Sequence, residues 1–262
     1  MRLFSLPKLS LIVIAIMLSA CSITKGIAYD VPTALFEGPE TSGAFLKLNT
    51  AYSLSNGVQI KVGEVQVSEF NTSIDKTRSI NSIYKSTLHL DMGLLSRLDF
   101  KADLRMNFLS RSFHLYGLKY QIFGEPALQK NKGVKWAILL KGVTRNFSDK
   151  FSVPPNTGEI SLESNIAEIA SIIGHRYSPK LLAYNTLVYR HYDINTKAQA
   201  TSSTDYLADA SSKSLALLVG VELNGRKSNA RLEAGLNRSR LTGLSKINTS
   251  FVAGFRLNRS WF

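Results

Sequence analysis

The last stretch of the chain reads KINTSFVAGFRLNRSWF, from Lys246 to Phe262. Every second position of it is apolar or small: Ile247, Thr249, Phe251, Ala253, Phe255 and Leu257. The other phase holds Asn248, Ser250, Val252, Gly254, Arg256 and Asn258. Because side chains alternate across a strand with a period of two, the stretch is predicted to be a strand with one apolar face. That face would point to a core in a soluble sandwich, and to lipid in a membrane barrel whose polar face lines the lumen.

The same alternation recurs along the chain. Further runs with this pattern lie at 44–54, 58–67, 87–94, 100–108, 114–122, 135–141, 167–177, 181–192, 215–223 and 229–236. With the last stretch they make eleven runs, whereas bacterial single-chain barrels usually have an even number of strands. We therefore expect an all-β, antiparallel, transmembrane up-and-down β-barrel of about 12 strands, with 10 strands as the alternative.

Turn signals between the runs alternate in length. Ser55-Asn56-Gly57, Ser178-Pro179 and Asn224-Gly225 are typical of tight turns. The polar stretches 69–85, 148–159 and 195–213 are predicted to be long loops, and a change of phase near Gly63-Glu64 indicates a bulge. Short turns on one side and longer loops on the other are typical of outer-membrane barrels. The barrel is therefore favoured, and a soluble sandwich is the alternative.

The N-terminus carries an export signal. The apolar run from Leu9 to Ala20 spans about 12 residues, too few for a membrane-spanning helix, and Arg2 and Lys8 precede it. We predict a signal peptide at 1–20, a tether at 21–42 and the barrel at 43–262. The formal net charge of the chain is +13, and two of these charges leave with the signal peptide. In an exported protein this surplus favours contact with phosphate headgroups over nucleic acid, so no nucleic-acid partner is expected.

Several motifs resemble those of bacterial outer-membrane β-barrel lipoproteins. They are Leu18-Ser19-Ala20-Cys21, Gly38-Pro39-Glu40-Thr41-Ser42-Gly43, Ser96-Arg97-Leu98-Asp99-Phe100, Gly117-Leu118-Lys119-Tyr120-Gln121, Gly174-His175-Arg176-Tyr177-Ser178-Pro179 and the C-terminal aromatic residue. The first looks like a lipobox. The resemblance implies palmitate and other acyl chains on Cys21, the single cysteine of the chain. An ordinary signal peptide with a chance cysteine is the alternative.

By resemblance, Ser22 after the cysteine implies sorting to the outer membrane. The implied partners are outer-membrane lipids, lipopolysaccharide and the barrel-assembly machinery, which would read the C-terminal strand. One departure is that Phe262 falls in the polar phase of the last strand. The resemblance implies a location and a fold, and no particular activity.

A polar cluster is predicted on the lumen faces of the runs. Its members are His89, Asp91, Lys101, Asp103, Arg105, Lys141, Arg231, Glu233 and Arg256. His89 and Asp91 share a face with Thr87, and Asp103 lies across the next hairpin, so an ester-hydrolysing arrangement is conceivable. A charge network that satisfies buried polar groups is the favoured interpretation. No histidines or cysteines have metal-ligand spacing, and no cofactor motif occurs.

The function expected from these features is a lipid-anchored outer-membrane barrel with a structural, interaction or narrow-transport role, and no enzyme activity. One alternative is a barrel enzyme, a hydrolase or acyltransferase acting on lipid or lipopolysaccharide. Another is a soluble periplasmic barrel lipoprotein that binds an apolar ligand. A surplus of lumen cations would favour anions in an open pore. Alternatively, paired charges would plug the lumen, and the tether could pass up through it.

Overall fold

The computed structural model describes residues 22–32, 35–69, 71–76, 78–106, 114–129, 131–201, 203–225, 228–241 and 244–257. These form twelve strands: β1 Ser22–Pro32, β2 Leu48–Ser68, β3 Thr72–Asp75, β4 Ser79–Leu95, β5 Leu98–Met106, β6 His114–Phe123, β7 Gly133–Val153, β8 Asn156–Ser178, β9 Leu181–Ala200, β10 Ser203–Asn224, β11 Ser228–Leu241 and β12 Leu244–Leu257. Among the described residues no helix is both long and apolar enough to cross a membrane. The predicted signal peptide, Cys21 and Trp261-Phe262 lie outside these residues.

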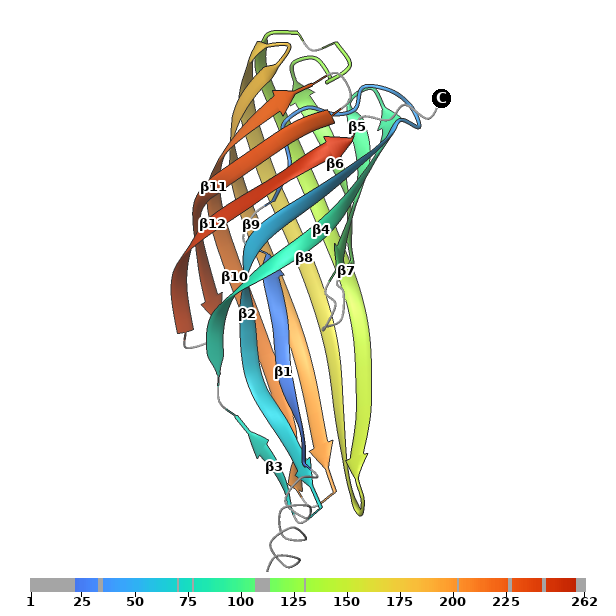
Figure 1. Cartoon of the computed structure of the whole chain (residues 1–262), viewed down its shortest axis with the longest axis vertical. Coiled ribbons are helices and arrows are strands. Elements are labelled where there is room, and N and C mark those ends of the chain that lie inside the picture. Colours follow the sequence, from blue (N-terminus) through green and yellow to red (C-terminus); the bar gives the residue numbers. More distant parts are fainter. Residues whose placement is uncertain are drawn as a thin grey trace, which may run out of the picture.

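The strands close into an antiparallel ring. From β4 to β12 each strand pairs with its neighbour in sequence, and β2 pairs with both β4 and β12 (Figure 1). The ring therefore contains ten strands, which was the alternative, and the preferred count of twelve is wrong for the barrel. The two remaining strands, β1 and β3, pair with β2 outside the closed path. Ten is an even number of strands, so the ring agrees with the even number usual for bacterial barrels, which the eleven runs in the sequence did not.

The predicted hairpin at Ser55-Asn56-Gly57 is also wrong, because β2 runs straight through it and pairs with β4 from Leu48 to Lys61. On the other edge of β2, pairing with β12 ends at Ser55 and pairing with β1 begins at Gly57. The Asn56 side-chain amide donates to Thr249 O at 2.6 Å and accepts from Phe251 N at 2.7 Å. The Asn-Gly pair thus marks an exchange of partner strands, since the amide takes the place of a backbone peptide.

The three predicted long loops are mostly strand. β7 and β8 pair down to Val153 and Asn156, and β8 and β9 pair down to Gly158 and Ala200. Residues 72–75 form β3, and β4 begins at Ser79. The predicted bulge has a counterpart one residue away, because the register of β1 and β2 shifts between Ile27 and Ala28 and skips Val62. The long strands carry the structure well beyond the ring in the lower half of Figure 1.

We call this lower part the extension. It comprises β1, β3, residues 57–68 of β2 and the lower halves of β7 to β10. There β1, β2 and β3 form one layer that contacts β7, β8, β9 and β10. The core between the layers is apolar and includes Val58, Ile60, Val65, Val67, Val153, Ile160, Ile194 and Tyr206. The extension is therefore a two-layer sandwich with a conventional interior.

The long strands reverse their polarity between the ring and the extension. On β9 the outward side chains from Leu181 to Tyr189 are mostly apolar, and Leu187 is 50% exposed. Further down the same face, from Asp193 to Gln199, they are polar. The inward face of the same strand carries buried Arg190 in the ring and buried Ile194 in the extension. The ring is thus apolar outside and carries buried charges inside, beside one apolar cluster, while the extension is polar outside and apolar inside.

Candidate functional site

The lumen of the ring contains residues 35–42, which we call the lumen segment. After β1 the chain enters the ring, crosses it, and leaves at the rim where β2 begins (Figure 1). Residues 35–42 are all buried. At the inner end Leu35 packs in a cluster with Leu139, Ala170, Leu182 and Leu218. At the rim Thr41 donates its hydroxyl to Ser96 O at 3.0 Å. The predicted tether therefore forms a strand and a plug.

The lumen segment balances the buried charge. Among the buried described residues, the ring walls supply eight cations: Lys85, Lys101, Lys119, Lys135, Lys141, Arg176, Arg190 and Arg231. The walls supply six carboxylates: Asp91, Asp99, Asp103, Glu168, Glu222 and Glu233. Glu37 and Glu40 of the lumen segment bring the buried carboxylates to eight. Over these fully buried residues the formal charges balance, with Arg256 left out because its side chain is 13% exposed. The balance fits the predicted network of paired charges better than the alternative of an open pore that favours anions.

Both carboxylates of the lumen segment make several ion pairs. Glu37 lies 3.0 Å from Lys101 Nζ, 3.4 Å from Lys119 Nζ and 3.7 Å from Lys141 Nζ. Glu40 accepts from Arg176 Nε at 2.6 Å and also pairs with its Nη2. Lys119 donates to the backbone carbonyl of Glu40 at 2.6 Å. These charge-assisted bonds come from β5, β6, β7 and β8, so the segment is tied to one side of the ring wall.

The opposite wall holds Phe36. Its backbone N–H donates to Glu233 Oε2 at 3.0 Å, and Arg231 Nη1 donates to its carbonyl at 2.6 Å. Its φ of 58° lies in the left-handed region, which non-glycine residues rarely adopt. A Cβ on Gly254 would clash with the backbone oxygen of Tyr52 and lie 2.7 Å from the Phe36 ring, so this position of β12 needs glycine. The ring of Phe36 stacks on the imidazole of His89 with centroids 5.0 Å apart.

His89 joins two side chains on neighbouring strands. Its Nε2 lies 2.8 Å from Ser53 Oγ, and its Nδ1 lies 2.7 Å from Asp103 Oδ1. Of the two carboxylates that the sequence places near His89, Asp103 across the hairpin pairs with it and Asp91 on the same strand does not. Asp91 instead binds Lys101 at 2.8 Å and pairs with Arg256. Thr87, although buried, is not part of this constellation.

The structure places most of the predicted polar cluster on the inner wall. His89, Asp91, Lys101, Asp103, Lys141, Arg231 and Glu233 are buried there, and Arg256 is nearly so. The side chain of Arg105 lies outside the described residues. Sequence reasoning missed Ser53, Lys119, Arg176 and both glutamates of the lumen segment. Ser53 could have been found, because it lies between the outward Tyr52 and Leu54 in an alternating run and must therefore point inward.

A small space remains between the lumen segment and the wall at the rim. It measures about 220 Å³ and is lined by Gly38, Glu40, Ser42, Lys47, Asn49, Ala127, Leu128, Leu182, Glu222, Asn224, Asn229, Arg231 and Arg256. Asn49 Oδ1, Asn224 Nδ2 and Arg256 Nε have no hydrogen-bond partner among the described residues. At ~30 Å³ for each water molecule the space is polar enough and large enough for several.

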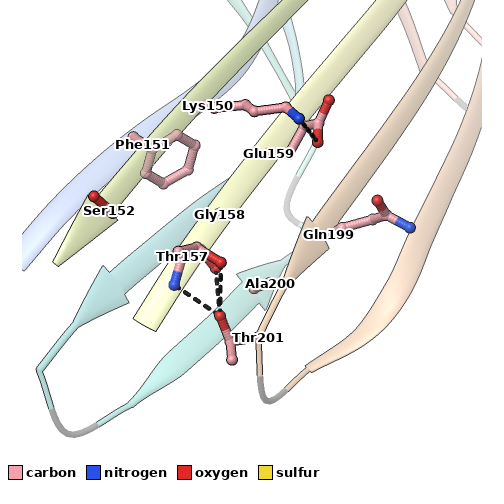
Figure 2. A pocket seen from close by; sticks show the side chains of 9 residues that line it. All are labelled: Lys150, Phe151, Ser152, Thr157, Gly158, Glu159, Gln199, Ala200 and Thr201. Atoms are coloured by element: carbon pink, nitrogen blue, oxygen red, sulfur yellow. Dashed lines mark hydrogen bonds and ion pairs between the residues drawn. The ribbon is translucent and has the colours of Figure 1, made fainter. Parts of the chain in front are cut away.

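A second, larger hollow of about 510 Å³ lies at the tips of the extension (Figure 2). Lys150 and Glu159 face each other there at 3.3 Å, and Thr157 N donates to Thr201 Oγ1 at 2.7 Å. A hydrogen bond from Ser148 lowers the pKa of the exposed Glu159 carboxyl. Few buried polar groups converge on this hollow, so the lumen is the better candidate site.

The described residues include no group of acidic, histidine or cysteine side chains that would hold a metal ion. Comparison with known protein families and with curated protein sequences finds no match.

Glu37→Gln is expected to destabilise the folded protein by about 3–5 kcal/mol, because it leaves Lys101, Lys119 and Lys141 short of a buried counter-charge. The measurement is the urea dependence of unfolding. Glu159→Gln is the matched control, since it removes a solvent-screened partner of Lys150 and should leave the urea midpoint almost unchanged. Equal effects of the two substitutions would contradict a charge-balancing role for the lumen segment.

Proposed function

We propose that the protein is a lipid-anchored outer-membrane β-barrel that does not conduct, because its own lumen segment closes it, and that it displays the extension for interaction with a partner. The observation that carries this proposal is the inverted ring: its exterior is apolar and exposed, while its interior holds paired charges around residues 35–42. A structural or interaction role fits a filled ring better than transport does.

The apolar exterior has the dimensions of a membrane belt. Outward apolar residues run from Leu181 to Tyr189 on β9 and from Leu215 to Leu223 on β10, which is about nine residues per strand, as a tilted membrane strand needs. Exposed aromatic side chains gather toward the rim, namely Phe45, Tyr120, Phe123, Trp136 and Tyr177. Such residues are typical of the interface between lipid and water.

The ends of the ring differ in a way that suggests its orientation. The turn between β8 and β9, the turn between β10 and β11 and the end of β12 all lie at the rim, and the extension lies at the opposite end. In bacterial barrels the periplasmic turns are short and the longer excursions of the chain are outside. The hairpins that continue into the extension are the longest excursions here, whereas the rim carries the turns named above and the β6–β7 connection, residues 124–132. We therefore propose that the extension projects from the cell surface. Its polar outward face suits an aqueous position.

The proposed anchor lies at the extension end. Ser22, the residue after Cys21, pairs with Ser68 at the far tip of β2. β1 has 11 residues, and a strand of that length spans about 35 Å. Acyl chains on Cys21 would thus lie on the side opposite the rim. To enter the membrane around the ring they would require β1 to separate from β2.

The alternative of an apolar ligand in a soluble barrel has less support. The inner face of the ring carries buried charges beside an apolar cluster, and the lumen segment occupies it, with Leu35 packed into that cluster. The extension has an apolar interior, but that interior is filled by its own side chains, among them Val65 and Ile160. An exposed belt of leucines around a soluble ring would also be an aggregation hazard.

Leu217→Arg should destabilise the protein in lipid vesicles by about 2–4 kcal/mol, because the outward face of β10 would place a charge in the hydrocarbon layer. The measurement is urea unfolding from vesicles. Asn195→Arg, on the polar outward face of the extension, should change stability by about 0.5 kcal/mol or less. A Leu217→Arg protein as stable as the control would contradict the membrane belt.

The wild-type protein should give no conductance steps in a planar bilayer, because the lumen segment fills the ring. Glu37→Lys combined with Glu40→Lys should give anion-favouring steps, since like charges would then face Lys101 and Arg176 and displace the segment. Regular steps from the wild-type protein, of the same size as those from the double variant, would contradict the closed lumen.

Cys21→Ala should abolish incorporation of labelled palmitate while the protein still folds in the outer membrane. Equal labelling of the variant would overturn lipidation at this residue.

If the acyl chains share the membrane with the ring, backbone amides of β1 should also exchange hydrogen faster in the lipidated protein than in Cys21→Ala, since β1 must separate from β2.

A further inference from the structure

We propose that Ser53, His89 and Asp103 form a serine-hydrolase site within the ring, covered by Phe36 of the lumen segment. This goes beyond the role of a closed barrel. The proposed function does not depend on this site. If the site proves inactive, the membrane belt and the lack of conductance are unaffected, because neither involves these three residues.

Strand register brings the three residues together. His89 of β4 lies directly opposite Asp103 of β5, and Ser53 of β2 lies opposite Thr87, one inward position along β4. All three therefore point into the lumen. Ser53 Oγ is 2.8 Å from His89 Nε2, and His89 Nδ1 is 2.7 Å from Asp103 Oδ1. These are the contacts by which a serine, its general base and an orienting carboxylate work together.

The carboxylate sets the role of each imidazole nitrogen. Asp103 can only accept from His89 Nδ1, so Nδ1 carries a proton and Nε2 is left to accept the hydroxyl proton of Ser53. Lys141 donates to the other oxygen of Asp103 at 2.7 Å and fixes the carboxylate in turn. Elsewhere in the lumen, Ser214 donates to the amide oxygen of Asn237. The amide of Asn237 cannot take a proton from Ser214, whereas the imidazole of His89 can take one from Ser53. Ser53 can therefore be activated as a nucleophile, and Ser214 cannot.

Phe36 is a cover held in a strained conformation. It stacks on His89, and its φ of 58° is held by bonds to Glu233 and Arg231. Backbone strain of this kind persists where the surroundings enforce it, and it is concentrated at active sites and switches. The ring fills the space next to the imidazole, so a substrate must occupy about the volume of that side chain. That volume limits the size of the substrate, and a carboxylic ester is the class proposed because an activated serine attacks its carbonyl carbon.

The reaction follows from the geometry. Ser53 Oγ attacks the ester carbonyl carbon while its proton passes to His89 Nε2, and the alcohol leaves with that proton as the carbon–oxygen bond breaks. Water then attacks the acyl–Ser53 ester, gives its proton to His89, and releases the carboxylic acid as Ser53 recovers its hydrogen. Ester and water give acid and alcohol, and no other reactant is needed. Asp103 acts through His89 and is a positioning residue.

The test is covalent labelling of the folded, full-length protein with diisopropyl fluorophosphate, followed by mapping of the labelled peptide by mass spectrometry. Phe36→Gly removes the cover, and glycine keeps the left-handed φ without strain. We expect Ser53 to be labelled at least about tenfold faster in Phe36→Gly than in the wild type, and not at all in Phe36→Gly combined with His89→Ala. Ser214→Ala in the Phe36→Gly background is the matched control and should not alter the rate. Phe36→Asn, which also tolerates this φ, serves if the glycine variant does not fold.

A second experiment tests whether Asp103 positions His89 or only stabilises the fold. In the Phe36→Gly background, Asp103→Glu should retain measurable p-nitrophenyl acetate hydrolysis, while Asp103→Asn should lose at least about tenfold with the protein still folded. The proposal is overturned if Ser53 stays unlabelled in folded wild-type protein and in both Phe36 variants. Labelling of Ser53 that is indifferent to His89→Ala would overturn it equally.

Discussion

The structure depends on the pairing of buried charge across the lumen. The ring walls bury more cations than carboxylates, and Glu37 and Glu40 supply the difference. Each stands among several cations; Glu37, for example, lies within 3.7 Å of three lysines. A buried cation without a counter-charge is costly in a medium from which water is excluded. Ring and lumen segment therefore specify each other, because neither has balanced charges alone.

Alternation along the strands does not decide between a sandwich and a barrel with an apolar exterior. The structure contains both a two-layer sandwich and a closed ring, and the same strands take part in each. On β8, outward Ile169 and Ile173 are half-exposed in the ring, while outward Glu159 and Glu163 belong to the extension. Alternation identifies a two-faced strand but does not say which face is inside. Only the closure of the ring and the layer formed by β1 to β3 decide it for each half.

Much of the ring was predictable, since the runs at 181–192, 215–223 and 229–236 fall within β9, β10 and β11. What failed depends on tertiary partners. Ser55-Asn56-Gly57 carries a strong turn signal, yet two strands pair on either side of it and override that signal. The stretch 195–213 reads as a loop because its inward residues are small or polar, such as Thr196, Ala198 and Ser212. These residues are buried all the same, and a search for alternating apolar residues does not detect buried positions that are small or polar.

The candidate site shows the same limit. The inward phase of His89, Asp91, Lys101 and Asp103 follows from alternation, but the pairing of His89 with Asp103 follows from register between two strands. The lumen segment is less predictable still, because a stretch of glycine, proline and glutamate has no period to read. Its confinement is topological. β1 and the start of β2 hold its two ends at opposite sides of the ring, and both strands belong to the same sheet. While β1 stays paired with β2, both ends of the segment are held, and the segment stays within the ring.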